Sequence, residues 1–197
     1  TLFNRFIYQF KMTSTISHKI KARNTPKDVF ITPKALAKMN IDMIPDEYED
    51  CLWLDPCANS NNYYNQFPTE TKDRCELLEG SDFLKIHPHK YPEHLVICSN
   101  PPYSILDKWF RQTIELKPKC FSYLIGIGNL TARRIEWCEQ AGYGLTKMKM
   151  LKVQSWFGMS VIVVFELGKK SIISIDRTVW YPDPVEEKQK VVFRKKI

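Results

Sequence analysis

Apolar residues in this chain gather in short continuous runs, and each run is followed by a turn or a polar stretch. The clearest runs cover residues 51–55, 94–98, 120–130 and 160–167. Their length and their content of Val, Ile, Leu and Phe are typical of strands buried on both faces. Residues 145–153 alternate Lys with Met, and together with 160–167 they predict an antiparallel hairpin.

Helical patterns lie between these runs. In one of them the residues that share an apolar face are Ile105, Leu106, Trp109, Phe110, Thr113 and Ile114. Ser104 and Asp107 predict a capping box at its start, and Pro118 ends it. Strands alternating with helices predict an α/β fold with a mostly parallel sheet.

Two further helices have recognisable ends. A helix over residues 131–141 is predicted to begin with Thr131 as its N-cap and to stop at Gly142. A short helix over residues 34–39 follows Thr32, which we expect to be its N-cap, because a proline comes next and suits the first turn.

Length and composition indicate one globular domain. The chain has 197 residues, of which 44% are hydrophobic and 13% aromatic, and a chain of that size buries a substantial core. We place a catalytic domain over residues 28–170. Before it lies a basic arm, 1–27, that we expect to be flexible, and after it an extension, 171–197, whose role the sequence leaves open.

The formal charge is +7, and basic residues gather in the first thirty positions and at the end of the chain. This distribution suits a polyanionic partner, although solvated tails are an equal alternative. The six cysteines are far apart and form no C-x-x-C pair, so we expect no disulfide framework and no metal site. Free thiols indicate a reducing, intracellular compartment, cytoplasm or nucleus. No stretch is long enough to span a membrane.

The motif with the most chemical content is Asn100-Pro101-Pro102-Tyr103, between the run 94–98 and the helix that follows it. In open α/β sheets ligands bind at the carboxyl ends of strands. The Asn100 side-chain oxygen and the Pro101 carbonyl can accept both hydrogens of a conjugated amino group, and the two prolines restrict the backbone that aims them. Tyr103 offers a face on which a flipped-out base can stack. These residues suit methyl transfer to such a nitrogen; the plainer alternative is that Pro-Pro ends a strand and Tyr103 packs at its rim.

This motif resembles motif IV of the S-adenosylmethionine-dependent N6-adenine methyltransferases, and other segments follow in the order of that family's motifs. Phe30, Thr32 and Pro33 resemble motif X, which lies across the cofactor. The run Asp55-Pro56-Cys57-Ala58-Asn59-Ser60-Asn61 resembles motif I, the cofactor loop, with asparagines where the family has two glycines. Asn is the best substitute for glycine at positive φ, so we expect the turn to form, with a helix around 62–66 behind it.

Three further features complete the resemblance. Glu76, with Glu79 in reserve, has the spacing of the acid that binds the cofactor ribose. Asp82 and Phe83 resemble motif III, which contacts the cofactor adenine. Trp156 and Phe157 resemble motif VIII, which meets the flipped base opposite Tyr103, although aromatic residues at a hairpin tip also serve as packing.

The resemblance implies a Rossmann-like class I methyltransferase with a seven-stranded, mostly parallel sheet, one antiparallel strand and helices on both faces. It implies S-adenosylmethionine as cofactor and the N6 amino group of adenine as acceptor, in DNA rather than RNA. Adenine in RNA, glutamine in protein, and a catalytically silent, nucleic-acid-binding subunit remain alternatives. No insertion large enough to recognise a target sequence lies between the motifs, so a partner subunit is a further expectation.

Overall fold

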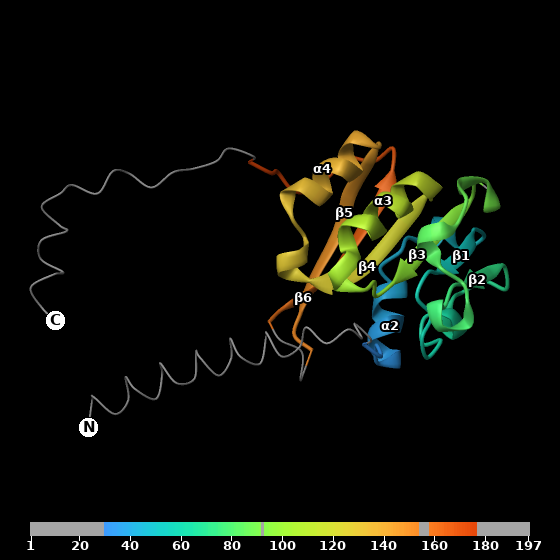
Figure 1. Cartoon of the computed structure of the whole chain (residues 1–197). Coiled ribbons are helices and arrows are strands. Elements are labelled where there is room, and N and C mark those ends of the chain that lie inside the picture. Colours follow the sequence, from blue (N-terminus) through green and yellow to red (C-terminus); the bar gives the residue numbers. More distant parts are fainter. Residues whose placement is uncertain (1–29, 92, 154–157, 177–197) are drawn as a thin grey trace, which may run out of the picture.

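The computed structural model describes residues 30–91, 93–153 and 158–176. In this part of the chain one mixed sheet forms the centre of the molecule (Figure 1). Its strands are β1 (Leu52–Asp55), β2 (Lys72–Arg74), β3 (Leu95–Ser99), β4 (Cys120–Gly126), β5 (Tyr143–Leu151) and β6 (Ser160–Leu167). The order is β2-β1-β3-β4-β6-β5, with β6 antiparallel to both neighbours and the other pairs parallel. The predicted mostly parallel sheet with one antiparallel strand is confirmed.

Helices cover both faces of this sheet, as predicted. The helices are α2 (Lys34–Ile41) on one face, and α3 (Leu106–Leu116) and α4 (Ala132–Gln140) on the other (Figure 1). Each face has its own apolar core. The core beneath α3 and α4 contains a group of aromatic rings in which Phe121 stacks on Phe165 with ring centroids 4.8 Å apart.

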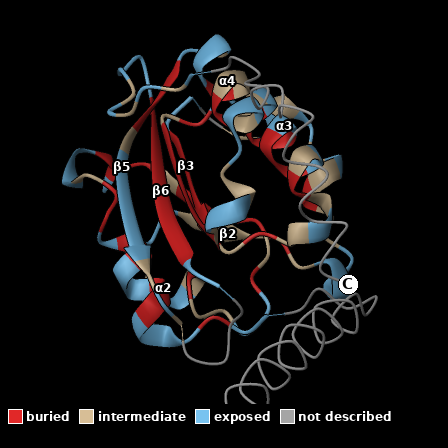
Figure 2. Cartoon of the chain, turned by 90° about the vertical axis from the view of Figure 1, so that its left-hand side faces the viewer, coloured by how far each residue is buried: buried red, intermediate tan, exposed pale blue. Residues whose placement is uncertain are grey.

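Strand β6 shows why the sequence contains unbroken apolar runs. Its residues Val161 and Val163 belong to the core under α3 and α4, whereas Ile162 and Val164 belong to the core under α2. Successive side chains of a strand point to opposite faces, so a strand covered on both sides needs apolar residues at every position. Figure 2 shows β6 buried along most of its length.

The seven-strand expectation is wrong for the part of the chain that the structure describes, where the sheet has six strands. Between β2 and β3 the chain forms only 3₁₀ turns, at Leu77–Glu79, Phe83–Lys85 and Pro88–Lys90. Tertiary contacts hold this segment: the Phe83 ring packs on Trp109, 4.6 Å between centroids, and the Gln112 side chain donates to the Ile86 carbonyl at 2.8 Å.

Of the three N-caps that the sequence predicts, the structure confirms one. The Thr131 hydroxyl accepts a hydrogen bond from the Arg134 amide at the start of α4, and Gly142 follows the helix with a φ of 89°, as predicted. No side chain caps α3, which begins at Leu106, so the predicted capping box is wrong. The helix expected around 62–66 is the 3₁₀ turn Tyr64–Gln66.

Thr32 is also not the N-cap of α2, because Pro33 occupies that position and no side chain caps the helix. The packed domain extends beyond residue 170, since Ile173 and Ile175 pack on the core and the Ile172 amide donates to the Leu145 carbonyl at 2.8 Å. All six cysteines are free thiols. Among the described residues, no helix has the length and apolar character needed to cross a membrane.

Candidate functional site

The predicted site residues converge where β1 and β3 end. These strands are parallel neighbours in the sheet. From β1 the chain continues to β2, toward one edge of the sheet, and from β3 it continues to β4, in the opposite direction. Such a switch in direction opens a crevice between the two following loops, which is where α/β sheets bind ligands. Asp55 is the last residue of β1, and Asn100 follows the last residue of β3.

The loop after β1 makes the expected turn without glycine. Asn59 and Asn61 have φ values of 43° and 59°, in the left-handed region where the family has its glycines. Asparagine tolerates this conformation better than other residues with a side chain. The prediction that asparagine can form this turn is therefore confirmed.

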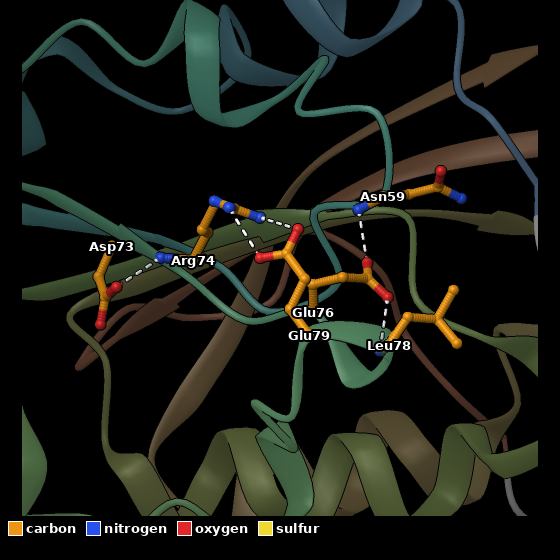
Figure 3. A network of polar contacts seen from close by, with 6 residues as sticks. All are labelled: Asn59, Asp73, Arg74, Glu76, Leu78 and Glu79. Carbon is orange, nitrogen blue, oxygen red and sulfur yellow. Dashed lines mark hydrogen bonds and ion pairs between the residues drawn. The ribbon is translucent and has the colours of Figure 1, made fainter.

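Glu76 supports this loop from beside β2. One of its carboxylate oxygens accepts from the Asn59 amide at 2.7 Å and the other from the Leu78 amide at 3.2 Å (Figure 3). Glu79 instead faces Arg74, and its carboxylate accepts two hydrogen bonds from the Arg74 guanidinium (Figure 3). The structure therefore separates the two candidate acids: Glu76 meets the loop, and Glu79 belongs to a surface ion pair.

Asp55 lies beneath the loop and is fully buried. Its Oδ1 accepts from the Ser99 hydroxyl at 2.7 Å and from the Cys57 amide at 3.3 Å. Its Oδ2 is buried and has no hydrogen-bond partner in the described structure. Burial raises the pKa of Asp55 to about 7, because removing the carboxylate from water penalises its charged form more than these hydrogen bonds favour it.

The Asn100 side chain likewise has one polar atom with a hydrogen-bond partner and one without. Its Nδ2 donates to the Thr32 hydroxyl at 3.1 Å, while its Oδ1 is buried and without a partner among the described residues. The Cys57 thiol donates to the Asn100 carbonyl at 3.1 Å, which ties the two loops together. Most buried polar atoms in proteins have partners, so an unpaired acceptor at a loop crevice marks a place for a donor from outside.

Aromatic rings form the rim of the site. The rings of Phe30 and Tyr103 stack with centroids 6.4 Å apart and an angle of 29° between their planes. Gly126, at the end of β4, lies so close to Tyr103 that an added Cβ would be 3.7 Å from the ring. Tyr103 thus presents its ring to Phe30, and its predicted role in stacking on a base stays a prediction.

Several predicted residues line one small cavity of about 20 Å³, namely Phe30, Thr32, Cys57, Ala58, Asn59 and Asn100. Its lining also includes Asn62 and Tyr63, which the sequence analysis missed. The Asn62 side chain donates to the Thr32 carbonyl at 2.7 Å. No motif signalled this role, since Asn62 stands in a polar stretch where any residue could face solvent.

Other predicted residues lie away from this cavity. Phe83 is only 2% exposed and is part of the core, so its ring does not face the crevice. Asp82 accepts from the Leu84 amide at the start of a 3₁₀ turn. Pro33 is exposed and Pro56 buried, and neither lines the cavity. Trp156 and Phe157 lie outside the described residues.

No protein-family model matches this chain, and no curated protein matches it. Solved structures do resemble it. A candidate tRNA (m1A22) methyltransferase of Streptococcus pneumoniae has a TM-score of 0.50 at 10% identity, with 75% of this chain and 74% of that chain covered.

Two further structures resemble the chain to a similar degree. The precorrin-6y C5,15-methyltransferase of Geobacter metallireducens has a TM-score of 0.49 at 11% identity, over 73% of this chain and 92% of that one. A chain of the E. cuniculi Mtq2–Trm112 complex, which methylates the eRF1 termination factor, has a TM-score of 0.48 at 16% identity, over 73% of this chain and 100% of that one. At these identities the likeness concerns the fold: the chain has a Rossmann-like methyltransferase fold.

Proposed function

We propose that this chain is an S-adenosylmethionine-dependent methyltransferase that acts on the N6 amino group of adenine in nucleic acid, with DNA favoured over RNA. The observation that carries the proposal is the buried, unpaired Oδ1 of Asn100, whose amide nitrogen is already bonded to Thr32. An acceptor kept free in this way suits an amino group that arrives with the substrate.

The residues around the loop after β1 fit the cofactor. Its ribose hydroxyls would match Glu76, whose two oxygens each keep a lone pair after accepting one amide. Asp55, buried beneath the loop, would hold the loop in place through the Cys57 amide. When bound, the cofactor supplies an electrophilic methyl group. The cavity of about 20 Å³ is far smaller than the roughly 300–1,000 Å³ of pockets that enclose ligands of this size, so binding requires its walls to move apart.

The acceptor side is formed by Asn100, Pro101 and Tyr103. Asn100 Oδ1 and the Pro101 carbonyl accept the two amino hydrogens, which draws the nitrogen toward tetrahedral geometry and makes its lone pair available for attack. As that lone pair forms the new nitrogen–carbon bond, the sulfur–methyl bond would break and the neutral thioether would leave. The methylated nitrogen would then release a proton to solvent, so no strongly basic side chain is needed. Tyr103 stacks on the base, and Phe30, which now lies against that ring, moves aside or stacks as well.

The net charge of +7 and the aromatic rim support nucleic acid over a protein acceptor. A partner subunit would supply sequence recognition. Glutamine in a protein presents a similar conjugated amide nitrogen, so it remains the alternative acceptor. A silent subunit is the second alternative, and the left-handed turn at Asn59 and Asn61 speaks against it, because the loop keeps the shape that a cofactor needs.

The test is methyl transfer from tritiated S-adenosylmethionine to single-stranded DNA, duplex DNA, RNA and a glutamine peptide, with the full chain as enzyme. We expect label in DNA, recovered as N6-methyladenine after hydrolysis. Asn100→Ala should abolish transfer while the calorimetric Kd for S-adenosylhomocysteine stays within about twofold. Asn65→Ala, at an exposed asparagine, is the matched control. Label only in the peptide, or cofactor binding without transfer to any acceptor, would contradict the proposal.

A further inference from the structure

Thr32 does not cap helix α2, although its position in the sequence suggests that role. A Thr-Pro pair before a helix is a usual N-cap arrangement, yet no side chain caps α2. The Thr32 side chain is instead directed into the protein, where only 5% of the residue is exposed. Its hydroxyl oxygen lies 3.1 Å from Asn100 Nδ2, across 68 positions of the chain.

This contact holds the Asn100 side chain at the crevice. A primary amide has a donor end and an acceptor end of almost the same shape. With Nδ2 bonded to the Thr32 hydroxyl, Oδ1 is the end that stays free and buried. A hydroxyl can also donate, so the contact fixes the place of the amide, and loss of the hydroxyl would leave the Asn100 amide without its hydrogen bond to Thr32.

The backbone of Thr32 is itself fixed from the loop side. Asn62 donates to the Thr32 carbonyl at 2.7 Å, and the Gln66 side chain donates to the Lys34 carbonyl at 3.0 Å. Both donors belong to the segment that follows the left-handed turn of the loop after β1. Thr32 therefore joins that loop to the asparagine of the Asn-Pro-Pro-Tyr motif.

From this geometry we infer that Thr32 is a positioning residue, which holds the Asn100 amide at the crevice, where its oxygen can meet the methyl acceptor. The contact stands on the structure of this chain alone. Its consequence for the reaction rests on the proposed function, and the test below separates the two.

The informative variants are Thr32→Val, which keeps the branched shape without the hydroxyl, and Thr32→Ser, which keeps the hydroxyl. The first readout is the NMR signal of the Asn100 side-chain amide, identified by its loss in Asn100→Ala. In the wild type and in Thr32→Ser we expect slow exchange of the Nδ2 protons and a cross-peak to the residue at position 32. In Thr32→Val we expect at least about tenfold faster exchange. Unchanged exchange in Thr32→Val would overturn the inference.

The second readout is methyl transfer. Thr32→Val should lower kcat about 10- to 100-fold and leave the Kd for S-adenosylhomocysteine within about twofold, with kcat restored in Thr32→Ser. A loss confined to cofactor affinity would overturn the inference, because it would make Thr32 a cofactor contact. Thr69→Val, remote from the crevice, is the matched control. If Thr32→Val does not fold, Thr32→Ala removes the hydroxyl without filling its place.

The two readouts fail in different ways. A wild type that transfers no methyl group contradicts the proposed function, but its amide exchange still measures the contact between Thr32 and Asn100. An active wild type whose Thr32→Val variant keeps both kcat and slow exchange contradicts the positioning role alone.

Discussion

The Ser99 hydroxyl donates a hydrogen bond of 2.7 Å to Asp55 Oδ1, across the adjacent ends of β3 and β1. This bond joins the strand that leads into the cofactor-like loop to the strand that leads into Asn-Pro-Pro-Tyr. It satisfies one oxygen of a fully buried carboxylate and leaves the other free. The bond compensates only partly for burial, since the pKa of Asp55 remains raised, to about 7.

The raised pKa makes the stability of the protein depend on pH. Between the unfolded pKa of Asp, about 4, and the native pKa of about 7, native Asp55 holds a proton that the unfolded chain has released. The free energy of unfolding therefore falls as pH rises through this window. Asp55→Asn removes the effect. Measured by urea unfolding, the free energy of unfolding of the variant relative to the wild type should therefore rise by on the order of 1–4 kcal/mol from pH 4 to pH 8.

Asp73 is a control, because its contribution to stability depends on pH in the opposite direction. Burial by itself would raise the pKa of Asp73, but hydrogen bonds from Tyr91, from the Arg74 amide and from Lys90 outweigh it and hold the pKa below its usual range. Its contribution to stability is present at neutral pH and is lost as pH falls through that lowered pKa. Asp73→Asn should therefore lose stability relative to the wild type at neutral pH and approach it in acid. The same trend for both variants would contradict the assignment for Asp55.

The left-handed turn leads to a second prediction. Asn61 has a φ of 59°, and a side chain other than Asn, Asp or Gly costs about 1 kcal/mol or more in that region. Asn61→Ala should lower the free energy of unfolding by about that amount, whereas Asn61→Gly should retain it. Urea denaturation measures both. Ser60→Ala, at the exposed neighbouring position, should stay within about 0.5 kcal/mol; an equal loss there would point to a general weakness of the loop.

Glu76 and Glu79 are chemically identical and three positions apart, which makes them a matched pair. In Glu76→Gln one of the two backbone amides that the carboxylate now accepts would face an NH₂ group. We expect the calorimetric Kd for S-adenosylmethionine to rise about tenfold or more. Glu79→Gln weakens only a surface pair with Arg74, so its Kd should stay within about twofold. Similar effects of the two substitutions would show that Glu76 has no special place in the site.

Several features could be predicted from the sequence because they depend on nearby residues. The apolar runs predicted the core strands, since a strand covered on both faces needs apolar residues throughout. The place of Asn100 after β3 followed from the run before it. The left-handed turn at Asn59 and Asn61 followed from the backbone preference of asparagine.

Other features depended on contacts between distant segments. The chain between β2 and β3 forms 3₁₀ turns, and Phe83 belongs to the core because α3 brings Trp109 against it. A motif match places Phe83 only by its neighbours in the sequence, which carry no record of that packing.

Thr32 shows the same division at the centre of the site. The sequence determined which residue types are present: a threonine before a helix and an asparagine after a strand. Only the tertiary structure decided that the threonine hydroxyl bonds to the asparagine amide and leaves the amide oxygen free. The physical reason is that a local pattern reports the backbone preference and burial of its own segment, whereas the orientation of a side chain depends on which distant groups the fold brings within hydrogen-bond reach.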